Sequence, residues 1–132
     1  MSQKTIAQKL FIKEGNKVLF INVPEDYMSL LGDLPKNVEF SSESDKGVDF
    51  IQIFAENKAE LEEQLPTLKK KMNDDGKLWV TYHKGTSKIK TDINRDILRE
   101  YTLSIGLKAI AMISIDKEWS AMRLKVLDQE IL

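Results

Sequence analysis

The sequence contains no cysteine, which excludes disulfides, thiol chemistry and cysteine-ligated metals. It has one histidine, His83, and its carboxylates lack the spacing of a ligand set, so no metal is expected. No apolar run approaches the roughly 20 residues of a membrane-spanning helix, and the first residues do not resemble a signal peptide. These absences predict a cytoplasmic protein of a reducing compartment.

Basic and acidic side chains are present in nearly equal numbers. The 132 residues include 20 basic and 21 acidic side chains, which gives a net charge of -1. A general nucleic-acid binder or membrane-surface binder would carry more positive charge, so we expect neither partner. A homo-oligomer and a small anionic ligand stay open as partners.

Apolar runs of strand length alternate with segments of helical periodicity, over a length that suits a single domain. Residues 1–14 are expected to form a short helix or an arm. We expect strands at 17–22, 38–40, 48–54, 78–82, 107–115 and 122–127, and helices at 25–31, 58–72 and 91–104. This alternation predicts one α/β domain over residues 1–132, a three-layer Rossmann-like sheet that is mainly parallel.

Three local features refine this prediction. The connection at 116–118 is short enough for a hairpin, so the last two strands should form a C-terminal antiparallel pair. Pro66 should kink or restart its helix, because proline lacks the N–H that an interior position donates. Thr91 or Asp92 should cap the helix that follows.

Three features follow one another along the chain: the strand at 48–54 (VDFIQIF), the helix ending in KKKMNDDGKLWVTY (69–82) and the closing antiparallel pair. In this order the chain resembles the second half of a Rossmann-like methyltransferase over residues 17–127. That resemblance implies an adenosylmethionine site after the first strand, at a glycine-rich turn. The turn here, NVPEDYMSLLG (22–32), has no G-x-G pattern.

This departure argues against the usual mode of adenosylmethionine binding. The side chains of Val23 and Pro24 would crowd the backbone approach that glycine permits. Glu25 and Asp26 would repel a phosphate. The cofactor therefore stays unknown, with adenosylmethionine as the one that the resemblance suggests.

A second set of motifs covers most of the chain: G-x-L-W-V at 76–80, the T-D helix start at 91–92 and D-x-x-W-S at 116–120. Together with Lys84 and Ser87 in the intervening loop, these motifs resemble a family of small bacterial domains of unknown function. That resemblance implies a fold and supplies no activity.

The loop at 83–90 is the candidate ligand site, because it leaves the carboxyl end of a predicted strand and carries several cations before a helix start. Such an arrangement suits an anion. A solvated loop with a helix cap is the alternative, since Asp92 would itself fill the positive helix end. The candidate ligand-binding residues are His83, Lys84, Ser87, Thr91, Asp92 and Trp119.

Two side-chain types in this region have alternative roles. His83 could act as a general base, because imidazole ordinarily titrates near neutrality, or it could be an ordinary packed histidine. Trp79 should belong to the core, whereas Trp119, expected at the hairpin tip, could pack there or line a pocket or a dimer contact.

No Ser-His-Asp, G-x-S-x-G or paired-carboxylate pattern is present, and whether the chain is an enzyme stays open. We interpret it as a binding or interaction module without catalysis of its own. The alternative is a degenerate methyltransferase-like enzyme or sensor that binds an anionic or nucleotide-like ligand at residues 83–92.

Overall fold

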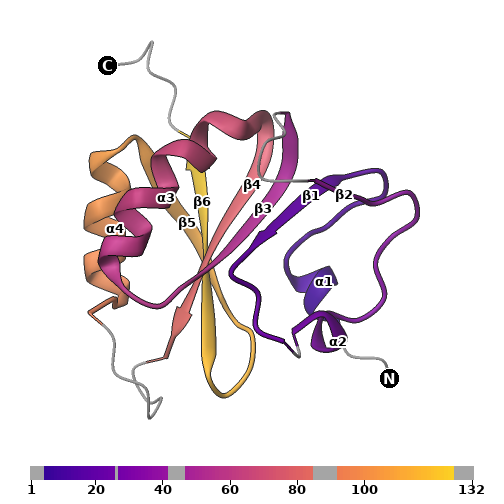
Figure 1. The fold of residues 1–132 in the computed structure, drawn as a ribbon, viewed down its shortest axis with the longest axis horizontal. Helices are drawn as coiled ribbons and strands as arrows, with labels where there is room; N and C mark the ends of the chain where they lie inside the picture. Colours follow the sequence, from indigo (N-terminus) through magenta and orange to yellow (C-terminus); the bar gives the residue numbers. More distant parts are fainter. Residues whose placement is uncertain (1–4, 26, 42–46, 85–91, 127–132) are drawn as a thin grey trace.

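A six-stranded sheet forms the middle layer of the protein, with helices on both of its faces (Figure 1). The computed structural model describes residues 5–25, 27–41, 47–84 and 92–126. The elements follow the chain in the order α1 (Ile6–Lys9), β1 (Lys17–Ile21), α2 (Tyr27–Leu31), β2 (Glu39–Phe40), β3 (Val48–Ala55), α3 (Lys58–Lys71), β4 (Met72–His83), α4 (Arg95–Ser104), β5 (Leu107–Ser114) and β6 (Trp119–Val126).

The strands lie in the order β2-β1-β3-β4-β6-β5. β1 is parallel to β2 and β3, and β3 is parallel to β4. β6 is antiparallel to both β4 and β5, which makes β5 and β6 the predicted closing hairpin. The prediction of a mainly parallel Rossmann-like sheet with an antiparallel C-terminal pair is therefore confirmed.

Each face of the sheet has its own apolar core, because successive side chains of a strand point to opposite faces. On one face, Leu65 of α3 and Leu98 of α4 belong to a cluster with Ile51 of β3. On the other, Leu31 of α2 belongs to a cluster with Trp79 of β4. Buried apolar side chains on both faces explain why β1, β3 and β4 appear in the sequence as continuous apolar runs.

The expected cap of α4 is wrong. Asn94, rather than Thr91 or Asp92, is the N-cap, and its Oδ1 accepts a hydrogen bond of 2.9 Å from the backbone N–H of Ile97. Asp92 instead accepts a hydrogen bond of 2.8 Å from the backbone N–H of Lys58, at the start of α3. A carboxylate suits either helix start equally, so only the packing of the two segments decides between them.

Strand boundaries also differ from those expected. β4 begins at Met72, directly after α3, and the NDDG segment that was expected to separate them lies in a pairing irregularity. β6 begins at Trp119, so this residue lies at the first position of the strand, paired with His83, and not at the tip of the hairpin. Within the described residues, no helix is long and apolar enough to cross a membrane.

Pro66 does not restart its helix, because α3 runs without interruption from Lys58 to Lys71. Proline lacks the N–H that would donate to the carbonyl four residues earlier, which here is Glu62. The Tyr101 hydroxyl donates to that Glu62 carbonyl across a long contact of 3.4 Å. Burial, and then the Glu62 carboxylate, raise the pKa of Tyr101, so its hydroxyl remains a donor at neutral pH.

We expect Pro66 and Tyr101 to be energetically coupled. Replacing Pro66 with alanine should stabilise the protein by about 1–2 kcal/mol, because alanine restores the missing helical hydrogen bond. Tyr101→Phe should cost about 0.5–1 kcal/mol in the natural sequence and less once Pro66 has been replaced. Urea unfolding of the two single variants and the double variant measures the coupling. Thr67→Ala, at an exposed position of the same helix, is the control, and strict additivity would contradict the idea.

A candidate ligand site at the carboxyl edge of the sheet

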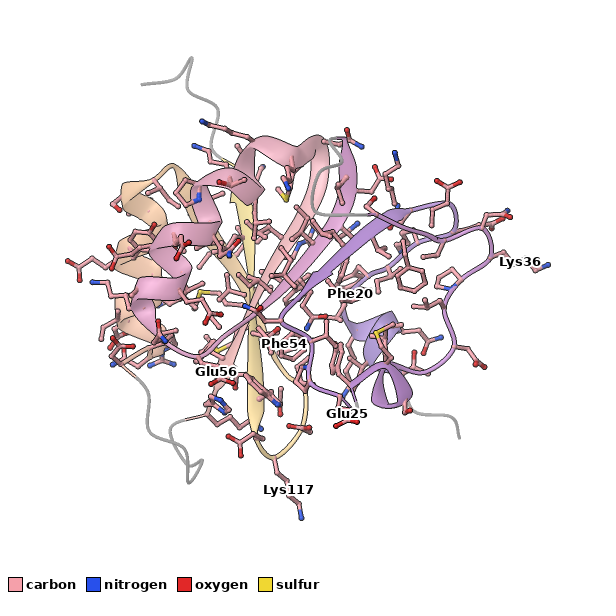
Figure 2. All side chains as sticks on the ribbon, in the orientation of Figure 1. Phe20, Glu25, Lys36, Phe54, Glu56 and Lys117 are labelled. Atoms are coloured by element: carbon pink, nitrogen blue, oxygen red, sulfur yellow. The ribbon has the colours of Figure 1, made fainter. Side chains whose placement is uncertain are left out.

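The parallel strands β1, β3 and β4 end at Ile21, Ala55 and His83, and their carboxyl ends share one edge of the sheet. Open α/β sheets bind their ligands at this edge. It lies at the bottom of Figure 1, together with the turn between β5 and β6. Glu25, Glu56 and Lys117 line the same side of the molecule in Figure 2.

The turn after β1 is made without glycine. Asn22 adopts φ 59°, a left-handed conformation that asparagine tolerates better than most residues. Its Nδ2 donates a hydrogen bond of 2.6 Å to Oε1 of Glu60 on α3, which holds the turn beside that helix. Val23 is half-buried and packs against the core under α1 and α2, so much of the crowding expected from it is removed. The crowding expected from Pro24 stays a prediction, and Asp26 lies outside the described residues.

The described charges along this edge are mainly negative. The acidic residues are Glu25, Glu56, Glu60, Asp92, Asp96, Asp116 and Glu118, and the basic residues are Lys58, Lys84, Arg95 and Lys117. These carboxylates repel a phosphate-bearing ligand, so the edge favours a neutral or cationic ligand.

His83 is only 3% exposed at the end of β4. Its Nδ1 lies 2.5 Å from Oε2 of Glu118, and its ring stacks on Trp119 with centroids 4.0 Å apart. An ionised carboxylate can only accept, so we assign the proton of this hydrogen bond to Nδ1. Nε2 is buried and has no hydrogen-bond partner among the described residues. The packed location disfavours His83 as a general base for a dissolved substrate.

Three of the predicted ligand-binding residues come together where β4 meets the β5–β6 hairpin: His83, Lys84 and Trp119. The Lys84 backbone N–H donates to the Glu118 carbonyl at 2.8 Å, and its Nζ donates to the Ser114 hydroxyl at 2.5 Å. Lys84 therefore fastens the hairpin to β4 and is already hydrogen-bonded.

The remaining predicted residues are not brought into that group. Asp92 caps α3 through the Lys58 N–H, as described above. Ser87 and Thr91 lie outside the described residues, so their part in an anion site stays a prediction. Trp119 is half-buried between His83 and Phe54, which agrees with the core interpretation of this residue.

Beneath the edge runs a series of contacts that sequence reasoning missed. Trp119 meets Phe54 edge-to-face at 5.1 Å, and Phe54 meets Tyr27 of α2 at 4.6 Å. The Tyr27 hydroxyl donates to Oε1 of Gln52, whose Nε2 donates to the Thr81 hydroxyl, both at 2.8 Å. A glutamine inside the apolar run VDFIQIF was the available signal, because a buried amide requires polar partners.

Burial raises the pKa of Tyr27 far above its usual value, although the hydrogen bond to Gln52 acts in the opposite direction. The nearby carboxylate of Asp116 raises it further. Tyr27 is therefore a neutral donor throughout the physiological range, and the polar relay from α2 through β3 to β4 stays intact. Because Tyr27 begins α2, this relay holds the segment that follows the Asn22 turn.

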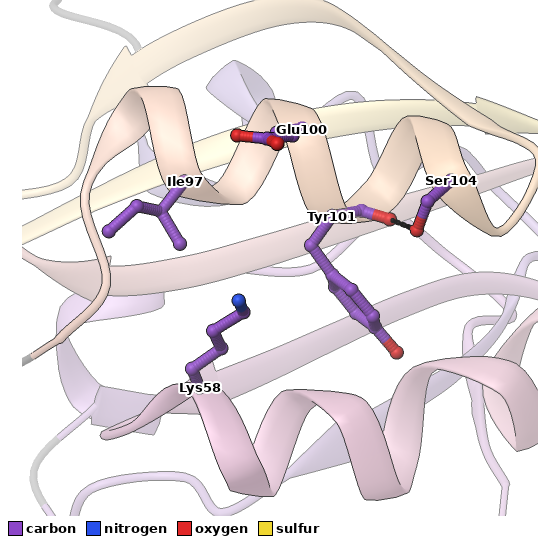
Figure 3. A pocket seen from close by; sticks show the side chains of 5 residues that line it. All are labelled: Lys58, Ile97, Glu100, Tyr101 and Ser104. Atoms are coloured by element: carbon purple, nitrogen blue, oxygen red, sulfur yellow. Dashed lines mark hydrogen bonds between the residues drawn. The ribbon is translucent and has the colours of Figure 1, made fainter.

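A shallow cavity of about 240 Å³ lies between α3 and α4 (Figure 3). Of the predicted ligand residues, Asp92 is next to it through its hydrogen bond to the Lys58 N–H. It is lined by Lys58, Ile97, Glu100, Tyr101 and Ser104. Tyr101 points towards α3 in this view, and the Ser104 hydroxyl donates to the Tyr101 carbonyl. Among the described residues, no group of histidine and carboxylate side chains could hold a metal ion.

Comparison with known proteins gives a fold and no family. No family model matches the chain, and none of the curated proteins does. A TehB-like SAM-dependent methyltransferase from Corynebacterium glutamicum is similar in structure, with a TM-score of 0.62 and 14% identity over 95% of this chain and 89% of that one. A SAM-dependent methyltransferase from Aquifex aeolicus also has a TM-score of 0.62, with 18% identity over 92% and 88%.

A third solved structure, DhpI in complex with SAH, has a TM-score of 0.62 and 12% identity over 89% of this chain and 79% of that one. The chain has a methyltransferase-like Rossmann fold. At these identities the likeness concerns the fold alone, so the chemistry of the site depends on the residues described above.

Proposed function

We propose that this chain is a methyltransferase-like binding module that takes a nucleoside-type ligand without phosphate at its carboxyl edge and transfers no methyl group itself. Adenosylmethionine is the first candidate. The observation that carries the proposal is the left-handed turn at Asn22, which opens on an edge whose described charges are mainly carboxylates. We also expect the chain to belong with the small bacterial domains that it resembles and to work in the cytoplasm.

The chemistry of the ligand suits this edge. Adenosylmethionine carries a sulfonium cation and ribose hydroxyls and has no phosphate. Carboxylates accept hydrogen bonds from hydroxyls and attract a cation, and the exposed Glu25 follows the Asn22 turn directly. The same charges would repel ATP or a dinucleotide.

The position of His83 supports binding without catalysis. A general base must lie within hydrogen-bond reach of the proton that it removes. The ring of His83 stacks on Trp119 and is hydrogen-bonded to Glu118. It is the one histidine of the sequence.

Isothermal titration calorimetry with adenosylmethionine, adenosylhomocysteine and ATP tests this function. We expect the first two to bind and ATP not to, and a ligand at 100 times its Kd to stabilise the fold by about 2.7 kcal/mol. Glu25→Lys should weaken binding by about ten-fold through a reversed charge at the turn. Glu14→Lys makes the same charge change before β1, at the opposite end of the sheet, and should leave affinity unchanged.

Three results would overturn the proposal. Failure of both sulfur-containing ligands to bind would reject the ligand class. Binding of ATP instead, weakened by Lys84→Ala, would favour the alternative anion site at residues 83–92. Conversion of adenosylmethionine to adenosylhomocysteine in the presence of a metabolite extract would show an enzyme.

A further inference from the structure

The pairing of the last strands gathers basic side chains that are far apart in the sequence. Lys108 of β5 lies directly opposite Lys125 of β6. In the pair β4–β6, Leu78 lies opposite Leu124. Lys77 of β4 and Lys125 of β6 are the residues that come next after this last pair of the ladder. A row of lysines therefore crosses three neighbouring strands.

This row is on the face of the sheet opposite to α3 and α4. Leu107 and Leu124 belong to the core under those helices, and each is followed by a lysine that must point to the other face. On that other face, α2 lies at the side of β1 and β2 (Figure 1), and the end of α1 reaches β4, where the Leu10 carbonyl accepts from the Trp79 indole. β5 is the strand at the far edge of the sheet. Lys108 and Lys125 are both exposed.

An exposed aromatic ring adjoins the row. Phe11 is 40% exposed and has φ 63°, and the Arg123 guanidinium lies 5.6 Å from the centre of its ring. The Lys13 ammonium lies 5.7 Å from the same ring. Arg123 precedes Lys125 by two positions on β6, so both project from the same face. We call Lys108, Lys125, Arg123, Lys13 and Phe11 the basic face.

Stability of the fold does not account for this arrangement. Like charges directly opposite each other on neighbouring strands are destabilising. Neither Lys108 nor Lys125 forms an ion pair with another residue that the structure describes. A site that recognises negative charge would offset this cost.

We propose that the basic face binds a short acidic segment of a partner protein, with an apolar side chain of that segment against Phe11. Its charge is complementary to carboxylates, and the ring offers apolar area beside them. A long nucleic acid fits less well, because the chain has a pI of about 5.9 and a mainly acidic carboxyl edge that would repel a polyanion extending past the face.

Fluorescence anisotropy of a labelled eight-residue peptide, six glutamates and two leucines, tests the proposal with the whole chain. We expect binding that weakens as salt rises, and Lys108→Glu should reduce affinity by about ten-fold. The melting temperature of this variant should be unchanged or higher, because the new carboxylate pairs with Lys125. Phe11→Ala should reduce affinity a few-fold without changing the salt dependence.

Lys117→Glu is the matched control, since the exposed Lys117 lies in the turn before β6, at the other end of that strand from Lys125 (Figure 2), and the charge change is identical. Retention of affinity in this variant supports a local site. Equal loss in both variants, or no binding of the peptide by the natural protein, would overturn the proposal. Binding of a single-stranded 15-nucleotide probe in place of the peptide would reassign the face to nucleic acid.

Discussion

Replacing Trp79 with alanine is expected to lower the free energy of unfolding by about 3–5 kcal/mol, the cost of removing a fully buried large aromatic side chain. Trp79 is 0% exposed in the core beneath α1 and α2. Its indole N–H also donates to the Leu10 carbonyl at 3.1 Å, which fastens the N-terminal segment to β4. The change therefore removes both packing and the anchor of that segment.

Urea unfolding followed by circular dichroism measures this effect. Trp79→Phe keeps an aromatic ring but loses the N–H donor, so it should fall between the natural protein and the alanine variant. Phe40→Ala, at a position 60% exposed, should stay within about 0.5 kcal/mol of the natural protein. A loss in Trp79→Ala no greater than that of Phe40→Ala would show that Trp79 does not support the core.

Replacing Gln52 with leucine should cost about 2–4 kcal/mol, because two buried hydroxyls lose their partner at once. Gln52 is 0% exposed and links Tyr27 of α2 to Thr81 of β4. The affinity for adenosylmethionine should fall as well, since Tyr27 begins the helix that follows the Asn22 turn. Urea unfolding and calorimetry on the same samples give both quantities.

The control is a variant that removes the whole relay, with Tyr27→Phe and Thr81→Val added to Gln52→Leu. Apolar groups of similar shape leave no unsatisfied donor or acceptor, so most of the lost stability should return. A triple variant less stable than Gln52→Leu alone would reject the relay as the cause. Recovery of stability without recovery of affinity would indicate that the relay positions the ligand turn.

The local cap of α4 illustrates where reasoning from sequence stops. Asp92 and Asn94 have similar capping preferences, and both lie close before the helix. The start of α3, far away in the sequence, binds Asp92 and leaves α4 to Asn94. Pro66 is a similar case, because Tyr101 from α4 supplies the hydrogen bond that the proline removes.

The sequence by itself determined which segments form strands and helices, apart from their exact boundaries, and it determined the mainly parallel sheet and the closing hairpin. Continuous apolar runs, helical periodicity and a short connection are local signals, because each depends only on residues that are close in the sequence. It also placed His83, Lys84 and Trp119 at one end of the sheet.

Only the tertiary structure decided which distant side chains meet. Strand register set Lys108 opposite Lys125 and Gln52 opposite Trp79, which brings the Gln52 amide within hydrogen-bond reach of Thr81. Packing placed the His83 ring against Trp119 and Glu118. The physical reason is that register and face are properties of paired strands, and a shift of one residue would exchange every side chain between the two faces.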